Sequence, residues 1–226
     1  VMVVKDGKIS YNKSFGFYDY YKAQPVSRES VYDMASVTKI CATTLAVMKL
    51  YEEGKLDLKK NLGHYLEWVK GTDKEYLKVE DMLLHQAGLV AFIPFYKETL
   101  DSSGKPLDSI YFSSWREKFP VKVAQNLYMR EDWKDTMFSR ILKSPLGSWS
   151  KYVYSDNDFI FLGKIVEAIT LKSLERYAEE EFYKPMGLTS IGFRPQQRMP
   201  AMRIVPTEEE KIFRKQVLRG DVHDPG

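Results

Sequence analysis

Apolar side chains occupy nearly every face of a helix drawn through residues 40–51, ICATTLAVMKLY. A helix that is apolar all round is typically buried, so we expect this segment to run through the core. Gly54 follows it, and glycine fills at low cost the left-handed position at which many helices end.

Residues 1–16 alternate apolar and polar side chains around Asp6-Gly7. This pattern predicts a β-hairpin, because both turn positions tolerate positive φ. Periodic apolar positions predict further helices over 77–84, 159–170 and 173–183, and the pattern favours a last helix over 207–219.

Residues 91–150 have no regular pattern and are interrupted by the breakers Pro94, Gly104, Pro106, Pro120 and Pro145. We therefore predict an irregular segment here. Its many aromatic residues indicate either local core or a cover over the functional site, and we interpret the segment as a cover.

Composition narrows the classes of function. The chain has 226 residues, 44% of them hydrophobic, which is enough for the core of one large domain or two closely packed ones. The 34 basic and 31 acidic residues give a net charge of +3 without a long basic run, so we expect no nucleic-acid partner. No segment approaches the roughly 20 consecutive apolar residues of a membrane span. A single cysteine, Cys41, excludes an internal disulfide.

Ser36 and Lys39 stand at the start of the apolar helix. Side chains three apart share a helix face, so the Lys39 amine can reach the Ser36 hydroxyl. Burial at the mouth of the helix would disfavour the ammonium form, and a neutral lysine can act as a base. With Asp33 as a cap, the helix N-terminus would favour negative charge on the serine oxygen. Ser36 is therefore a candidate nucleophile.

The Ser-x-x-Lys spacing alone does not show that Ser36 is a nucleophile. Ser-x-x-Lys also occurs at Ser10/Lys13, Ser102/Lys105 and Ser148/Lys151, and none of these opens an apolar helix. A serine at a helix start with a solvated lysine one turn later stays an alternative for Ser36.

Tyr154-Ser155-Asp156-Asn157 forms a polar segment before the helix expected at 159. A tyrosine beside Lys39 could pass the serine proton to a leaving group. Taken alone, the segment is equally typical of an Asx turn next to a surface aromatic.

The histidines His64, His85 and His223 have no metal-like spacing, so no metal is assigned. A Ser-His-Asp triad through His85 or His223 stays open, although Lys39 is the better base. There is no glycine-rich phosphate loop, and we expect no cofactor.

Together these segments resemble the serine β-lactamase-like family of penicillin-recognising hydrolases, which includes class C β-lactamases, D,D-peptidases and related esterases. Ser36-Val37-Thr38-Lys39 is similar to its first motif, Tyr154-Ser155-Asp156 to its Tyr-x-Asn motif, and Leu83 to Leu89 to its helix-ending turn. The resemblance covers most of the chain. Pro206-Thr207-Glu208 and Gly220 to Asp224 are similar to a branch with some members fused to secreted glycosidases.

The resemblance implies an α+β fold of the β-lactamase/transpeptidase type, with a helical subdomain beside an antiparallel sheet. Residues 1–33 would supply a hairpin of the sheet and a lead-in, and 34–226 a mainly helical subdomain with the cover at 91–150. The family's third motif, Lys-Thr-Gly or His-x-Gly, and later strands are expected beyond residue 226. We therefore expect a partial domain, incomplete at both ends, that alone is a poor catalyst and self-associates through an unpaired sheet edge.

By resemblance, Ser36 is the acylated nucleophile, Lys39 its base and Tyr154 the partner that handles the proton. Asp156 stands where many members have Asn, at a substrate-binding position, and would repel a substrate carboxylate. The implied function is a serine hydrolase acting through an acyl-enzyme on a cell-wall peptide, a β-lactam or a simple ester. The alternative is a non-catalytic binding or accessory module of a larger secreted cell-envelope protein. Export to the periplasm or cell envelope is expected in either case.

Overall fold

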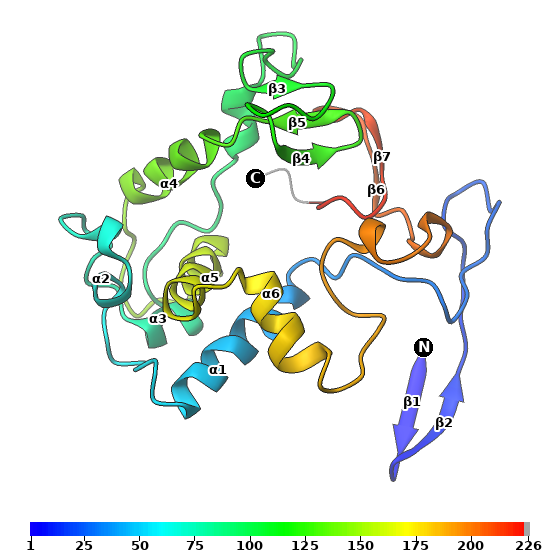
Figure 1. The fold of residues 1–226 in the computed structure, drawn as a ribbon, viewed down its shortest axis with the longest axis horizontal. Helices are drawn as coiled ribbons and strands as arrows, with labels where there is room; N and C mark the ends of the chain where they lie inside the picture. The colour runs from blue at the N-terminus through cyan, green and yellow to red at the C-terminus, as the bar shows by residue number, and fades with distance from the viewer. Residues whose placement is uncertain (224–226) are drawn as a thin grey trace.

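The computed structural model describes residues 1–223 and has a helical body with three small antiparallel sheets at its periphery (Figure 1). The α-helices are α1 Leu45–Glu52, α2 Leu62–Tyr65, α3 Val79–Leu83, α4 Trp133–Lys143, α5 Asp156–Thr170 and α6 Leu174–Ala178. Shorter turns are π-helical at Lys39–Thr44 and Glu179–Tyr183, and 3₁₀ at Glu67–Val69, Phe95–Thr99, Pro195–Gln197 and Ala201–Arg203. The strands are β1 Met2–Lys5, β2 Lys8–Asn12, β3 Tyr111–Phe112, β4 Val121–Ala124, β5 Leu127–Met129, β6 Glu208–Glu210 and β7 Gln216–Leu218. Helices and antiparallel strands lie in separate regions, which confirms the α+β class predicted from the sequence.

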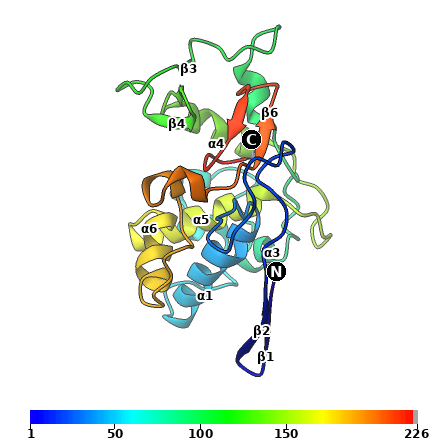
Figure 2. The same ribbon diagram turned by 90° about the vertical axis from the view of Figure 1, so that its right-hand side faces the viewer.

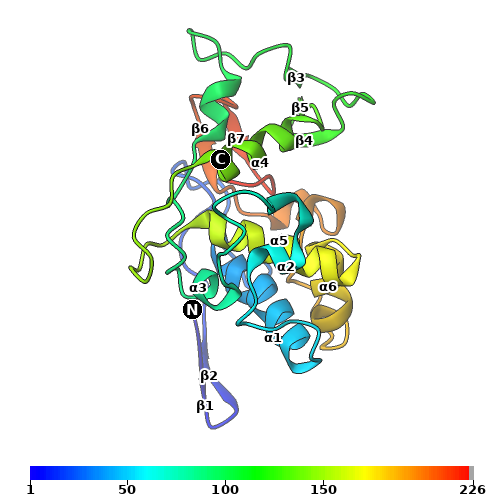
Figure 3. The same cartoon turned by 90° about the vertical axis from the view of Figure 1, so that its left-hand side faces the viewer.

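The predicted N-terminal hairpin is present as the antiparallel pair β1–β2. Asp6 and Gly7 have φ values of 51° and 71°, so both turn residues lie in the left-handed region that a tight hairpin of this twist requires. The hairpin extends away from the helical body in all three views (Figures 1, 2 and 3). Its apolar side chains are consequently exposed.

Helix α5 lies at the centre of the helical body. Its buried face carries Phe161, Leu162, Ile165 and Val166, which are all fully buried. This face belongs to one apolar cluster with buried residues of α1 and α3, so α5 fixes the position of both shorter helices. The helices predicted at 77–84, 159–170 and 173–183 are confirmed as α3, α5, and α6 with the π-helical turn that follows it.

The helix predicted at 40–51 is present, but it is not buried all round. Ile40, Met48 and Tyr51 are 66%, 60% and 55% exposed, whereas Ala46 and Leu50 are fully buried. Helix α1 packs against α5 and α6, while its side with Met48 and Tyr51 stays open to solvent. The apolar pattern therefore gave the correct element and the wrong extent of burial.

The expectation that residues 91–150 are irregular throughout is wrong, although much of the segment lies outside helices and strands. The segment contains α4 and a three-stranded antiparallel sheet in the order β3-β5-β4. These strands are only two to four residues long, which is too short for a periodic pattern to stand out between the prolines.

The helix expected over 207–219 is also wrong, because these residues form the hairpin β6–β7. The carboxylate of Glu210 accepts hydrogen bonds from the backbone N–H groups of Ile212 and Phe213, and this closes the loop between the strands. Phe213 is buried against Tyr96 and Tyr111, with ring centroids 5.8 and 5.5 Å away. Contacts with a distant segment thus override the local helical preference.

Candidate active site

Ser36 lies in an exposed turn that leads into the apolar helix. Ala35, the residue before it, has a φ of 43°, and the Lys39 N–H donates to the Ser36 carbonyl at 3.0 Å. Asp33 Oδ1 accepts from the Ala35 N–H at 2.8 Å, so Asp33 braces this turn and does not cap the helix as the sequence suggested. The Lys39 Nζ donates to Ser36 Oγ at 3.1 Å. The structure therefore brings the predicted pair together.

Lys39 forms an ion pair with Asp156, which is 117 positions later in the sequence. Its Nζ lies 2.5 Å from Asp156 Oδ1, and its side chain is only 14% exposed. The same Nζ lies 5.0 Å from the Tyr154 ring centroid and 5.9 Å from that of Phe159. The side chains around the Lys39 amine thus come from two segments: Ser36 from its own turn, and Tyr154, Asp156 and Phe159 from the start of α5. All of them except Phe159 were predicted from the sequence.

The charge state of Lys39 differs from the expectation. Burial lowers the pKa of Lys39, but its contacts with Asp156 and Tyr154, together with their charges, outweigh burial and raise the pKa above its usual value. Lys39 is therefore an ammonium ion at neutral pH in this structure. The neutral Lys39 expected from burial is therefore wrong, because Asp156 stabilises the ammonium form.

Tyr154 and Asp156 are positioned by the start of α5. The helix begins at Asp156, three residues earlier than predicted, with Ser155 as its N-cap: the Asn157 N–H donates to Ser155 Oγ at 3.2 Å. Ser155 Oγ in turn donates to the Val90 carbonyl at 2.6 Å. Asp156 therefore lies in the first turn of a long helix, which directs its carboxylate more firmly than the loop that we expected.

His85 and His223 each contact a carboxylate and not Ser36. His85 Nδ1 lies 2.8 Å from Asp158 Oδ2, and His223 Nδ1 lies 2.8 Å from Glu208 Oε2. Within residues 1–223, the side-chain hydrogen bond to Ser36 Oγ comes from Lys39, so the geometry supports a lysine-based arrangement over a histidine triad. Sequence reasoning missed Asp158, because a single buried carboxylate after a polar turn has no pattern of its own.

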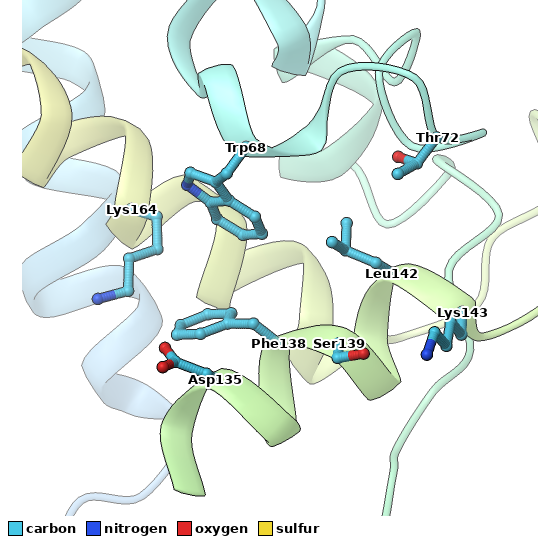
Figure 4. Close-up of a pocket in the computed structure, with 8 residues that line it drawn as sticks. All are labelled: Trp68, Thr72, Asp135, Phe138, Ser139, Leu142, Lys143 and Lys164. Atoms are coloured by element: carbon cyan, nitrogen blue, oxygen red, sulfur yellow. The ribbon is translucent and has the colours of Figure 1, made fainter. Parts of the chain in front are cut away.

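Several candidate features lie apart from this cluster. A cleft of about 570 Å³ opens between the Glu67–Val69 turn, α4 and α5, and its lining includes Trp68 and Phe138, whose rings are in edge-to-face contact with centroids 5.2 Å apart (Figure 4). It contains none of the predicted site residues. In the described part of the chain, no group of three or more His, Cys, Asp or Glu side chains could hold a metal ion. No helix within residues 1–223 is both long enough and apolar enough to cross a membrane.

Comparison with known protein families supports the resemblance seen in the sequence. A family model described as "Beta-lactamase" matches residues 1–221. Residues 222–226, including Asp224 at the end of the Gly220 to Asp224 similarity, lie beyond this match, and Asp224 also lies outside the described residues.

Two curated proteins are similar over 99% of this chain. "N-acetylmuramyl-L-alanine amidase" of Bacillus subtilis (strain 168) is 32% identical, and the match covers 51% of that protein. "Putative D-alanyl-D-alanine carboxypeptidase" of Escherichia coli (strain K12) is 33% identical, with 52% of that protein covered. The chain therefore spans about half the length of these relatives.

A solved structure shows the same fold at lower sequence identity. It is the octameric penicillin-binding protein homologue from Pyrococcus abyssi, with a TM-score of 0.66 and 21% identity. The match covers 100% of this chain and 47% of that one. This likeness extends the α+β class to the β-lactamase/transpeptidase-like architecture expected from the sequence.

Proposed function

The chain belongs to the β-lactamase family, and on this basis we propose that it is a serine hydrolase that acts through an acyl-enzyme at Ser36. The observation that carries the proposal is the 3.1 Å contact between Ser36 Oγ and Lys39 Nζ, with Tyr154 beside the same amine. A nucleophile within hydrogen-bond reach of a base is the basic requirement of covalent catalysis by serine.

The proposed acylation proceeds in two steps. Lys39, once its ammonium group has released a proton to solvent, accepts the proton of Ser36 Oγ while this oxygen forms a bond with the acyl carbon of the substrate. The tetrahedral intermediate then collapses, the bond to the leaving group breaks, and Tyr154 donates its phenol proton to the leaving group while it takes up the proton that Lys39 received from Ser36, which leaves Lys39 neutral for the next step. Water repeats the sequence on the acyl-enzyme and releases Ser36.

We propose a muramyl peptide as the acyl donor, with β-lactams and simple esters as alternatives. Support comes from the names of the two relatives, one an amidase at N-acetylmuramyl-L-alanine and the other a carboxypeptidase at D-alanyl-D-alanine. The same names support a location in the cell envelope. Mass spectrometry after incubation with a D-alanyl-D-alanine peptide would test this substrate: an acyl adduct on Ser36, or release of D-alanine, is the expected result.

The non-catalytic alternative makes the opposite prediction. A binding module would hold the peptide reversibly and carry no adduct on Ser36, with either the peptide or a reactive fluorophosphonate probe. Failure of both reagents to modify Ser36 in a folded chain that also carries the expected third motif would favour the module over the hydrolase.

Replacing Asp156 with asparagine is expected to speed acylation at pH 7. The substitution removes the carboxylate that raises the pKa of Lys39, so a larger fraction of the amine is neutral and able to accept the Ser36 proton. Each unit by which the pKa falls increases that fraction about 10-fold. The measurement is the rate of fluorophosphonate labelling at pH 7, with Asp135→Asn on α4 as the matched control. Slower labelling of Asp156→Asn would mean that the carboxylate is needed to hold Lys39 in place.

The same variant tests the proposal that Asp156 disfavours anionic acyl donors. Removing one negative charge should raise kcat/KM for nitrocefin relative to that for a neutral p-nitrophenyl ester, since like charges repel across a partly desolvated site. An unchanged ratio would remove Asp156 from the substrate-binding residues.

We also propose that the protein self-associates through the hairpin β1–β2. Among the described residues, these strands pair only with each other, and Val3, Val4 and Ile9 are 47%, 55% and 62% exposed. An exposed strand edge with apolar side chains is a template for pairing with another chain.

Light scattering should therefore show concentration-dependent dimers or larger species, and Ile9→Lys should reduce them. Met48→Lys is the control, because Met48 is equally exposed but lies on α1. A protein that stays monomeric at every concentration would disprove the association.

A further inference from the structure

His85 contacts the chain on both sides of Tyr154. The Val153 N–H donates to the His85 carbonyl at 2.9 Å, and the Ser155 N–H donates to His85 Nδ1 at 3.2 Å. The imidazole also lies against the phenol ring, with 4.5 Å between centroids. One residue thus fixes the backbone before and after Tyr154 as well as its ring.

His85 is itself firmly placed. It follows α3 with a φ of 55°, and its ring is also packed against Phe159 of α5, with centroids 5.3 Å apart. Val90 follows His85 by five residues, and its carbonyl accepts hydrogen bonds from both Ser155 Oγ and Asn157 Nδ2. The segment around His85 therefore forms the support on which the Tyr154 segment rests.

The contacts of His85 Nδ1 favour one placement of the protons. A backbone N–H can only donate, so the 3.2 Å contact from the Ser155 N–H favours a His85 Nδ1 that accepts and carries no proton. With Nδ1 as the acceptor, the 2.8 Å contact to Asp158 Oδ2 is a hydrogen bond when the carboxyl group carries the hydrogen, and the Asp158 hydroxyl and the Ser155 N–H then share the single lone pair of Nδ1. Asp158 Oδ1 is buried and has no hydrogen-bond partner among the described residues, which a neutral acid tolerates far better than a carboxylate.

We propose that His85 and Asp158 form a neutral pair, in which the Asp158 hydroxyl donates to His85 Nδ1, and that this pair positions Tyr154 beside Lys39. Both are positioning residues: they act through Tyr154, whose part in proton transfer rests on the proposed function. The tautomer follows directly, with the imidazole proton on Nε2.

The surrounding charges agree with neutral partners at pH 7. Burial raises the pKa of Asp158 to about 8. Burial also lowers the pKa of His85, the Lys39 charge lowers it further, and Asp156 acts in the opposite direction. The titratable and charged groups that face the His85 ring or its partners are Lys39, Tyr152, Tyr154, Asp156 and Asp158.

These pKa directions predict where the pair fails. The Asp158 pKa is raised relative to the unfolded chain, so its contribution to stability falls as the pH rises from about 4 through about 8, where the buried group ionises. The His85 pKa is lowered, so its contribution is present above the ordinary histidine pKa and is lost as the pH falls through the folded value. The hydrogen bond between Asp158 and His85 should therefore weaken at alkaline pH, where Asp158 ionises, and at acidic pH, where His85 gains a proton.

Replacing Asp158 is the decisive test. Asp158→Asn retains a neutral side chain with a donor, so acylation of Ser36 by a penicillin probe, whose leaving nitrogen needs the Tyr154 proton, should at pH 7 stay within about 3-fold of wild type, a change of less than about 1 kcal/mol. Asp158→Ala removes the donor and lets Tyr154 shift, which should slow labelling about 100-fold. At pH 9 wild type should lose rate relative to Asp158→Asn, because only the wild-type side chain ionises. Asp135→Asn is the control at each pH.

The tautomer can be measured without any activity. With three histidines in the sequence, ¹⁵N-labelled imidazoles can be assigned by comparison with His85→Gln. We expect an unprotonated Nδ1 and a protonated Nε2 at pH 7, and a Tyr154 ring resonance that moves in Asp158→Ala but not in Asp158→Asn.

A His85 imidazolium at pH 7, or Asp158→Asn labelling as slowly as Asp158→Ala, would overturn the neutral pair. Wild-type labelling rates in Asp158→Ala would overturn its positioning role. Absence of any adduct on Ser36 in wild type would instead refute the proposed function, and the imidazole spectrum would still decide the state of the pair.

Discussion

Replacing Ser36 with alanine is expected to abolish covalent labelling of the protein by a fluorophosphonate or a penicillin probe. The Ser36 hydroxyl is exposed and lies 3.1 Å from the Lys39 amine, so it is the atom that the proposed mechanism requires to carry the acyl group. Loss of a catalytic serine lowers the rate of a serine hydrolase by about a million-fold.

The measurement is the rate of labelling, followed by mass spectrometry of the modified peptide. Ser148→Ala is the matched control, because Ser148 is also exposed and also precedes a lysine by three residues. Recovery of the probe on a residue other than Ser36, or equal labelling of Ser36→Ala and wild type, would show that the nucleophile is misassigned.

Replacing Lys39 with arginine should slow labelling about 100- to 10,000-fold while leaving the fold unchanged. Arginine retains the positive charge and can keep the ion pair with Asp156, but its guanidinium does not lose a proton in proteins and cannot act as a base. This variant therefore separates proton transfer from electrostatic support, which Lys39→Ala would remove together.

Thermal unfolding followed by circular dichroism should give the same midpoint for Lys39→Arg and wild type. Lys151→Arg, at the corresponding position of the exposed Ser148 motif, should label at the wild-type rate. If Lys39→Arg labels as fast as wild type, the positive charge is what matters, and the base must be sought elsewhere, with Tyr154 the first candidate.

Features set by neighbouring residues could be predicted from the sequence. Asp6-Gly7 specifies the N-terminal hairpin because its two residues accept the left-handed conformation that the turn needs. The periodic apolar face of α5 specifies a helix that packs in the core. Ser36 and Lys39 were paired correctly because three residues of a helix-like turn bring their side chains together regardless of the rest of the fold.

Features set by distant residues could not. Lys74 is fully buried, with its Nζ bound to the carbonyls of Leu142 and Ser144 at the end of α4, although a lysine in a polar loop is normally exposed. The hairpin at Glu208–Leu218 replaces the predicted helix because Phe213 packs against aromatic rings more than 100 residues earlier in the chain. Packing of this kind leaves no periodic signal in the local sequence.

The sequence by itself determined the family resemblance, the α+β class and the identity of the candidate residues Ser36, Lys39, Tyr154 and Asp156. The tertiary structure decided what these residues are in chemical terms. Lys39 meets Asp156 from 117 positions away, and this contact reverses the direction in which burial alone would move the pKa of the amine. The state of His85 likewise depends on Asp158, 73 positions away. Protonation follows from the distance between charges and from their exposure to water, and a sequence lists the charges without giving either quantity.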